Sequence, residues 1–269
     1  IGSFPVNQIR LVLAVGLLAG LHLVVLGSAL PVFDGRYEES VWLLILSGLL
    51  GLTLGDTFYF RALVDLGPKL AALMMSTYPL VAAGIAWVAY EEALTPLAWV
   101  GVAVALGGVG LAIVARRPAP GDEERPKLWP GLLFGALGAV GQAVGIILSK
   151  EALLLPGIEA DSAEGVGRYD PLSGTLIRMT AAMVSLAPVL FWQVWWARRK
   201  GRAMRRSGLG DGRGTLALGR ALRDRRGVAL VAGGTVVGPV VGVWLSLIAI
   251  QQGAVAVVST LMATMPIFV

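Results

Sequence analysis

The chain of 269 residues contains no cysteine and a single histidine, His22. The absence of cysteine excludes disulfides, iron–sulfur clusters and thiolate zinc sites, and one histidine argues against a histidine-based metal site. Charged residues are also scarce, at 14%, whereas a soluble domain carries about 25%. We therefore expect no cofactor and no metal, and we expect lipid to be the solvent for most of the chain.

Apolar residues are abundant instead and form long blocks. They make up 56% of the chain, and the mean hydropathy is +0.77. A helix needs roughly 20 residues to cross about 30 Å of hydrocarbon, whereas barrel strands would be about ten residues of alternating polarity. The pattern predicts an all-α integral membrane protein with about eight spans. These are 9–30, 41–63, 69–90, 96–115, 128–150, 172–197, 228–250 and 253–269, the last of them incomplete.

Glycine pairs at four-residue spacing occur in several of these spans. Such pairs let helix backbones approach closely, so they predict a tightly packed bundle and say little about a substrate. The pairs are Gly51/Gly55, Gly131/Gly135, Gly141/Gly145 and Gly238/Gly242.

Three polar stretches separate the spans: a linker at 116–127, an acidic loop at 156–171 and an arginine-rich loop at 198–226. The last contains eleven basic and two acidic residues and so accounts for the positive net charge of the chain, +5; a charge confined to one loop gives no indication of nucleic-acid binding. The two basic stretches are separated by two spans and so lie on the same side of the membrane. The excess of positive charge on cytoplasmic loops predicts that 116–127 and 198–226 are cytoplasmic in a multi-pass protein of the cell (inner) membrane.

An internal repeat is visible in the motif Met-x-Thr-x-Pro, which ends at Pro79 and again at Pro266, an offset of 266 − 79 = 187. The same offset carries Gly51 to Gly238 and Gly55 to Gly242. Two related membrane halves are typical of secondary transporters, whose substrate site lies between the halves. Transport is therefore the leading interpretation.

A second match links Arg10 to Arg178, at an offset of 178 − 10 = 168. The second half thus gains 19 residues (187 − 168) before its next helix, and this insertion falls at the basic loop.

These features together resemble the EamA-type branch of the drug/metabolite transporter superfamily. The matching features are an arginine early in each half, a glycine-rich helix, a helix with a proline, and a Glu-x-Leu-Thr turn before a last glycine-containing helix. They stand here as Arg10 and Arg178; Gly51, Gly55, Ala62 and Leu63; Pro79 and Pro266; and Glu92 to Thr95 with Gly101, Gly107 and Gly108.

The resemblance implies ten helices in two inverted five-helix repeats. Residues 1–115 would then be the first repeat (helices 2–5), 116–127 the linker, and 128–269 a truncated second repeat (helices 6–9). We accordingly expect the chain to be a fragment that lacks the first helix and the last one and a half. The resemblance also implies cytoplasmic termini, which would place the basic loops outside. Because the loop charge is a property of this chain itself, we expect the orientation that the charge predicts, with the basic loops in the cytoplasm.

Asp56 is the deepest acidic residue in the predicted spans. Ionisable side chains at membrane depth are costly and usually face a cavity or a partner. Asp56 is therefore a candidate for proton or cation coupling, or for the counter-charge of a cationic substrate. The structural alternative is a pair with a neighbouring helix or with Arg61. Arg61 and Asp65 are spaced to pair with each other, and with Lys69 they are expected to be structural.

Two other polar residues, His22 and Gln142, lie in the middle of predicted spans. His22 is a candidate proton shuttle or a hydrogen-bonded packing residue, and Gln142 is a candidate cavity-lining residue. Arg10 and Arg178 begin their spans, where they either extend to lipid headgroups or form a gate or a contact with a substrate anion. Glu92 ends a span and is either a gate residue or solvated.

The two repeated prolines mark a further candidate pathway. A proline in a span bends the helix and frees a carbonyl, which is tolerated where the backbone is buried in protein or lines a cavity. A kink without substrate contact is the alternative. The candidate pathway residues are Met75, Thr77, Tyr78, Pro79, Met262, Thr264 and Pro266.

Three function classes remain. The first is a secondary transporter of a small metabolite or drug-like solute, with the bilayer and a small-molecule substrate as partners. The second is a non-transporting scaffold or assembly subunit. The third, an intramembrane enzyme, lacks a recognisable nucleophile, base or metal motif, so we expect no enzymatic activity. No nucleotide-binding motif is present to support ATP-driven pumping.

Overall fold

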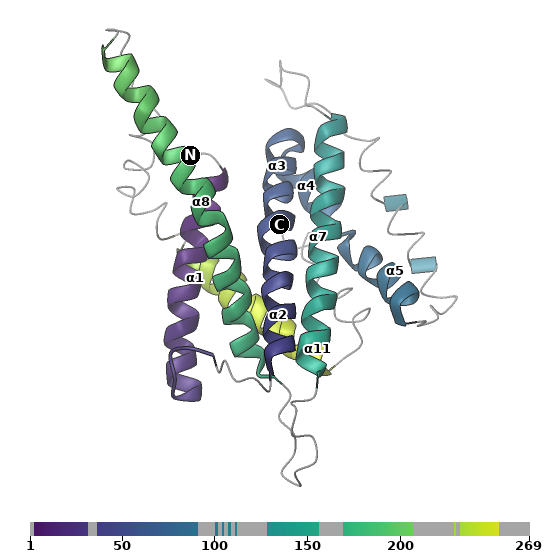
Figure 1. The fold of residues 1–269 in the computed structure, drawn as a ribbon. Helices are drawn as coiled ribbons and strands as arrows, with labels where there is room; N and C mark the ends of the chain where they lie inside the picture. Colours follow the sequence, from purple (N-terminus) through teal and green to yellow (C-terminus); the bar gives the residue numbers. More distant parts are fainter. Residues whose placement is uncertain are drawn as a thin grey trace.

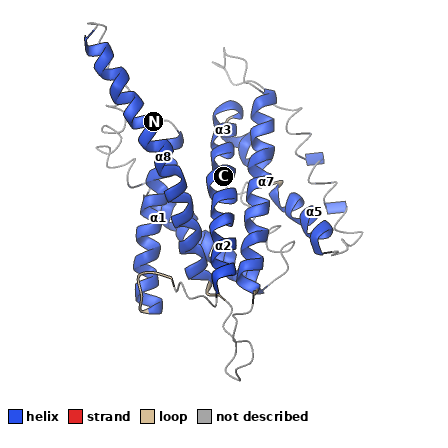
Figure 2. Cartoon of the chain, in the orientation of Figure 1, coloured by secondary structure: helices blue, strands red, loops and turns tan. Residues whose placement is uncertain are grey.

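The computed structural model describes residues 3–31, 37–90, 128–155, 169–206 and 232–252, with a few single residues at 100–111 and at 229. Within these ranges the chain forms helices and short turns and contains no strand, as Figure 2 shows. The predicted span 253–269 and most of 96–115 lie outside the described residues. So do Glu92, Met262, Thr264 and Pro266.

The described helices follow one another in the order of Figure 1. Several of them join end to end: α2, η2 and α3 run on without a break, as do η3 and α11, and a two-residue turn separates α4 from α5. Their bounds are α1 Ser3–Leu26, α2 Glu38–Ser47, η2 Gly48–Gly55, α3 Asp56–Leu66, α4 Pro68–Met75, α5 Tyr78–Tyr90, α7 Leu128–Leu154, α8 Pro171–Arg206, η3 Val236–Gly242 and α11 Val243–Gln252.

Four of the described helical stretches are long and apolar enough to cross a bilayer: Glu38–Leu66, Pro68–Val88, Leu128–Leu154 and Ala232–Gln252. A fifth apolar stretch, Arg10–Leu26 in α1, is shorter. The prediction of a helical membrane protein is confirmed. The number of spans and the two-repeat architecture stay predictions.

Helix α7 packs against α2, η2, α3, α4 and α5, and the glycine-rich part of the α2–η2–α3 rod approaches its backbone closely. A Cβ atom on Gly145 would lie 2.8 Å from the Cα atom of Gly51, and one on Gly141 would lie 2.9 Å from the Cα atom of Gly55. The predicted close packing through these two pairs is confirmed. Gly238, by contrast, has no neighbour within 4 Å of such a Cβ position.

Buried hydroxyl groups add hydrogen bonds to this helix pair. Ser47 donates its Oγ proton to the carbonyl oxygen of Gly145 at 2.7 Å, and its Oγ lies 2.7 Å from that of Ser149. Because lipid offers no hydrogen-bond partners, these bonds hold α2 and α7 in one register.

The second large contact joins α1 to α8 through a cluster of buried leucine, alanine and methionine side chains. Helix α1 also contacts η3, and α8 contacts η2. The two π-helical segments η2 and η3 end at Gly55 and Gly242, and 242 − 55 = 187 is the offset of the sequence repeat. Extended π-helical segments are rare and often mark functional sites.

Three helix boundaries differ from the prediction. Helix α8 continues to Arg206, so residues 198–206 are helical and the predicted loop begins too early. Helix α1 ends at Leu26 because Gly27 adopts a left-handed φ of 73°, which terminates the helix before residue 30. Two turn residues, Ser76 and Thr77, divide the predicted span 69–90 into α4 and α5, although Pro68–Val88 together is long enough to cross a bilayer.

Candidate functional site: a buried arginine–aspartate cluster

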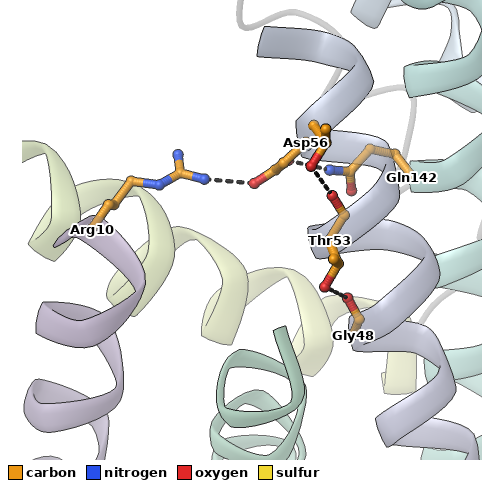
Figure 3. Close-up of polar contacts among 6 residues, drawn as sticks. Arg10, Gly48, Thr53, Asp56 and Gln142 are labelled. Atoms are coloured by element: carbon orange, nitrogen blue, oxygen red, sulfur yellow. Dashed lines mark hydrogen bonds and ion pairs between the residues drawn. The ribbon is translucent and has the colours of Figure 1, made fainter. Parts of the chain in front are cut away.

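Asp56 is the centre of a polar cluster inside the apolar bundle. It is the first residue of α3, directly after the π-helical segment, and only 6% of it is exposed. One carboxylate oxygen accepts a hydrogen bond from Nη2 of Arg10 at 2.6 Å, and the other accepts one from Nε2 of Gln142 at 2.8 Å. Figure 3 shows these donors reaching Asp56 from α1 and α7. The structure thus joins three residues that the sequence singled out separately.

Arg10 forms the more accessible side of the cluster, since 31% of its side chain is exposed. Its guanidinium carbon lies 5.6 Å from the centre of the Phe60 ring, an arrangement that favours a cation–π interaction. Its Nε atom is buried and has no hydrogen-bond partner among the described residues. Arg10 therefore binds Asp56 through one end of its guanidinium group.

Arg178, the repeat mate of Arg10, lies on α8 and is only 3% exposed. It lies close enough to Asp56 to interact with it electrostatically, but it makes no hydrogen bond or ion pair with any residue that the structure describes. A Cβ atom on Gly48 would lie 2.5 Å from the carbonyl oxygen of Arg178, and one on Gly51 would lie 3.6 Å from its Nη2. The glycines of η2 therefore allow Arg178 to lie flush against the π-helical segment.

Hydroxyl groups extend the polar surface along η2, as Figure 3 shows for Thr53. The Oγ atoms of Thr53 and Ser185 lie 2.7 Å apart, which connects η2 to α8. Thr53 also donates weakly to the carbonyl oxygen of Gly48 at 3.4 Å, and Thr57 donates to the carbonyl oxygen of Thr53. The sequence analysis missed Thr53 and Ser185. Their only signal was a hydroxyl inside an apolar span, and that does not identify a partner.

A cavity of about 460 Å³ lies beside this polar surface, between α1, the α2–η2 rod and α8. Its lining is almost entirely apolar, with the hydroxyls of Thr180 and Ser185 among the lining residues. Pockets of roughly 300–1,000 Å³ are typical of small-molecule sites. Sequence analysis did not predict this cavity, because its walls come from three helices that are distant along the chain.

The second ion pair is separate from the cluster. Nε of Arg61 lies 2.9 Å from a carboxylate oxygen of Asp65, and 51% of the Arg61 side chain is exposed. The predicted i,i+4 pair is therefore present, and Asp56 pairs with Arg10 rather than with Arg61. Lys69 is exposed at the start of α4.

His22 lies away from Asp56 and connects α1 to the start of α8. Its Nδ1 is 2.6 Å from the carbonyl oxygen of Ser28, and its Nε2 is 2.9 Å from Oγ of Ser173. A carbonyl can only accept, so Nδ1 carries a proton, and Nε2 shares the second hydrogen bond with the Ser173 hydroxyl. This geometry favours the packing interpretation of His22.

The first copy of the Met-x-Thr-x-Pro motif forms the turn between α4 and α5. Met75 ends α4, and Thr77 donates its hydroxyl to the carbonyl oxygen of Met74 at 2.7 Å. Pro79 follows as the second residue of α5, where the missing N–H does not interrupt the helix. Tyr78 packs against α7, and its buried hydroxyl has no hydrogen-bond partner in the part of the chain that the structure describes. No described contact joins this turn to Asp56, so the predicted common pathway stays a prediction.

The fold and the cluster define a helical membrane protein with charged residues at membrane depth. Residues 1–114 match the EamA-like transporter family, which confirms the resemblance to an EamA-type transporter of the drug/metabolite transporter superfamily. That family consists of transporters and not of enzymes. No curated protein matches the chain.

Proposed function

We propose that the protein is a secondary-active transporter that moves a small metabolite or drug-like solute by alternating access between two halves. The observation that carries the proposal is the buried cluster of Asp56, Arg10 and Gln142, which joins α1, α3 and α7. Charges within apolar helices are costly, and where they occur they usually mark an ion or substrate pathway. An assembly subunit would have no comparable need for them.

The crossed contacts of the arginine-bearing helices support the two-half arrangement. Helix α8, with Arg178, contacts η2, while its repeat mate α1, with Arg10, contacts η3. If the two halves rock against each other, these are the contacts that change, since each joins an element of one half to an element of the other.

Asp56 is the residue that we propose for proton or cation coupling. Its two present partners, Arg10 and Gln142, lie on different helices, so movement between α1 and α7 would separate one of them from the carboxylate. A carboxylate that loses a cationic partner at membrane depth then gains a proton or a cation to offset its charge.

We also propose that the linker 116–127 and the loop that follows α8 are cytoplasmic. The start of α7 and the end of α8 lie at the same end of the bundle in Figure 1, and the opposite ends of both helices lie together at the other. This arrangement supports a common side for the two basic stretches, and their positive charge supports the cytoplasm.

A proteoliposome uptake screen of amino acids, nucleosides, polyamines and drugs tests the proposed function. We expect at least one solute to enter protein-containing liposomes faster than protein-free liposomes, and to saturate. Uptake that equals the protein-free control for all solute classes would contradict transport and favour the scaffold alternative.

A further inference from the structure

The polar cluster contains one more positive charge than negative charge. Arg10 and Arg178 are both near Asp56, and Asp56 is the one carboxylate that interacts with them among the described residues. The other buried acid, Asp65, pairs with Arg61. A net positive charge inside an apolar bundle is costly unless an anion offsets it.

The hydrogen bonds of the cluster also leave Arg178 without a partner among the described residues. Each oxygen of Asp56 accepts one described hydrogen bond, from Arg10 and from Gln142, and neither bond comes from Arg178. A guanidinium carries five N–H donors, and those of Arg178 have no acceptor in the part of the chain that the structure describes. Nε is buried, so the proposed ligand pairs with the terminal Nη groups. Leaving a buried charged donor unpaired costs free energy, so the arrangement favours a ligand with acceptor oxygens.

We propose that Arg178 binds the oxyanion of the transported substrate, and that the substrate is a small organic acid whose carboxylate or phosphate pairs with the guanidinium. This inference rests on the proposed function and names the substrate class. A planar guanidinium presents parallel N–H groups that match two oxygens of a carboxylate or phosphate. Arg10 supplies a second positive charge on Asp56, and 31% of its side chain is exposed. The apolar cavity is lined by other residues of α8, among them Ile177 and Ser185, so its relation to Arg178 is through the shared helix.

The test uses matched sets of solutes that differ in charge: succinate, succinamide and 1,4-diaminobutane, and likewise benzoate, benzamide and benzylamine. Uptake is measured in phosphatidylcholine proteoliposomes preloaded with the unlabelled solute. We expect the acids to enter and their amides and amines to be excluded. Removing a charge-assisted pair weakens binding by about 10- to 100-fold, so Arg178→Gln should raise the KM for the acid by that factor. Arg178→Lys should retain part of the affinity, and Arg61→Gln, in the separate ion pair, should match the unmodified protein.

Asp56→Asn provides a second variant with the opposite expectation. It removes the internal competitor for the arginines, so the KM for the acid should fall rather than rise. Preferred uptake of an amide or amine would overturn the inference and leave transport intact, whereas no uptake of any solute would contradict the proposed function itself. An Arg178→Gln effect that appears only when phosphatidylglycerol is added would assign the oxyanion to a lipid headgroup, and would overturn the substrate assignment.

Discussion

Replacing Asp56 by asparagine removes the charge at the centre of the cluster while keeping its size. Asparagine can still accept from Arg10 through its oxygen, and it can donate to Gln142 if that amide rotates, so the number of hydrogen bonds is preserved. The loss is the charge assistance to the 2.6 Å contact with Arg10. Hydrogen bonds to charged groups contribute about 1.5–3 kcal/mol and neutral ones about 0.5–1.5, so this contact should lose about 1–2 kcal/mol. The uncompensated charges of Arg10 and Arg178 add to that cost. The bundle should still fold.

The functional effect should be much larger than this cost. If Asp56 exchanges a proton or cation during the cycle, Asp56→Asn should abolish accumulation driven by an ion gradient, while exchange between equal internal and external pools persists. Both rates are measured in proteoliposomes with the same protein preparation, with and without an imposed pH or sodium gradient.

Asp65→Asn is the matched control, because it removes a similarly buried carboxylate whose partner Arg61 is 51% exposed. Pairs with a solvated partner contribute only about 0–1 kcal/mol, so this variant should transport normally. Should Asp56→Asn accumulate substrate at the unmodified rate and with the same pH dependence, Asp56 is structural and coupling lies elsewhere.

Three further predictions concern packing and sidedness. Gly145→Ala places a methyl group 2.8 Å from the opposing backbone and should destabilise the bundle by about 1–3 kcal/mol in thermal unfolding. Gly20→Ala is the control, because no described atom lies within 4 Å of its Cβ position, and it should not destabilise the bundle. Equal effects of the two variants would contradict the close packing. His22→Ala should lower the unfolding temperature, because it removes a hydrogen-bond partner of the buried Ser173 hydroxyl. The same variant should keep the pH profile of transport. A changed pH profile would make His22 a proton carrier. In this cysteine-free chain, a cysteine at Gly210 should be protected from an impermeant thiol reagent in intact cells and one at Ala163 should react, and the reverse pattern would invert the orientation.

Sequence patterns were sufficient to predict the helical membrane class and to single out Asp56, Gln142 and Arg10 individually. Asp56 and Gln142 were identifiable because polar side chains are rare in apolar spans, and Arg10 because of its repeat mate Arg178. Their assembly into one cluster was not predictable. The partners of Asp56 are 46 and 86 residues away along the chain, and such contacts depend on how α1, α3 and α7 pack.

Local structure likewise includes features that the sequence predicts and features that it does not. The proline motif predicted an irregularity, and the structure has a complete turn at Ser76 and Thr77 because short hydroxyl side chains satisfy nearby carbonyls. The π-helical form of η2 was not predicted, because an apolar glycine-rich stretch reads the same whether its hydrogen bonds follow α or π spacing. Its recurrence at the repeat offset gives a structural counterpart to the matched glycines.

Concentrative uptake by the purified full-length protein tests the central claim most directly. The protein is reconstituted into liposomes without ATP, a pH or sodium gradient is imposed, and the internal concentration of a solute identified by the screen is followed. The account predicts transient accumulation above the external concentration, which a protonophore or a sodium ionophore collapses and which Asp56→Asn eliminates. Uptake that never rises above the external concentration under either gradient would contradict secondary-active transport.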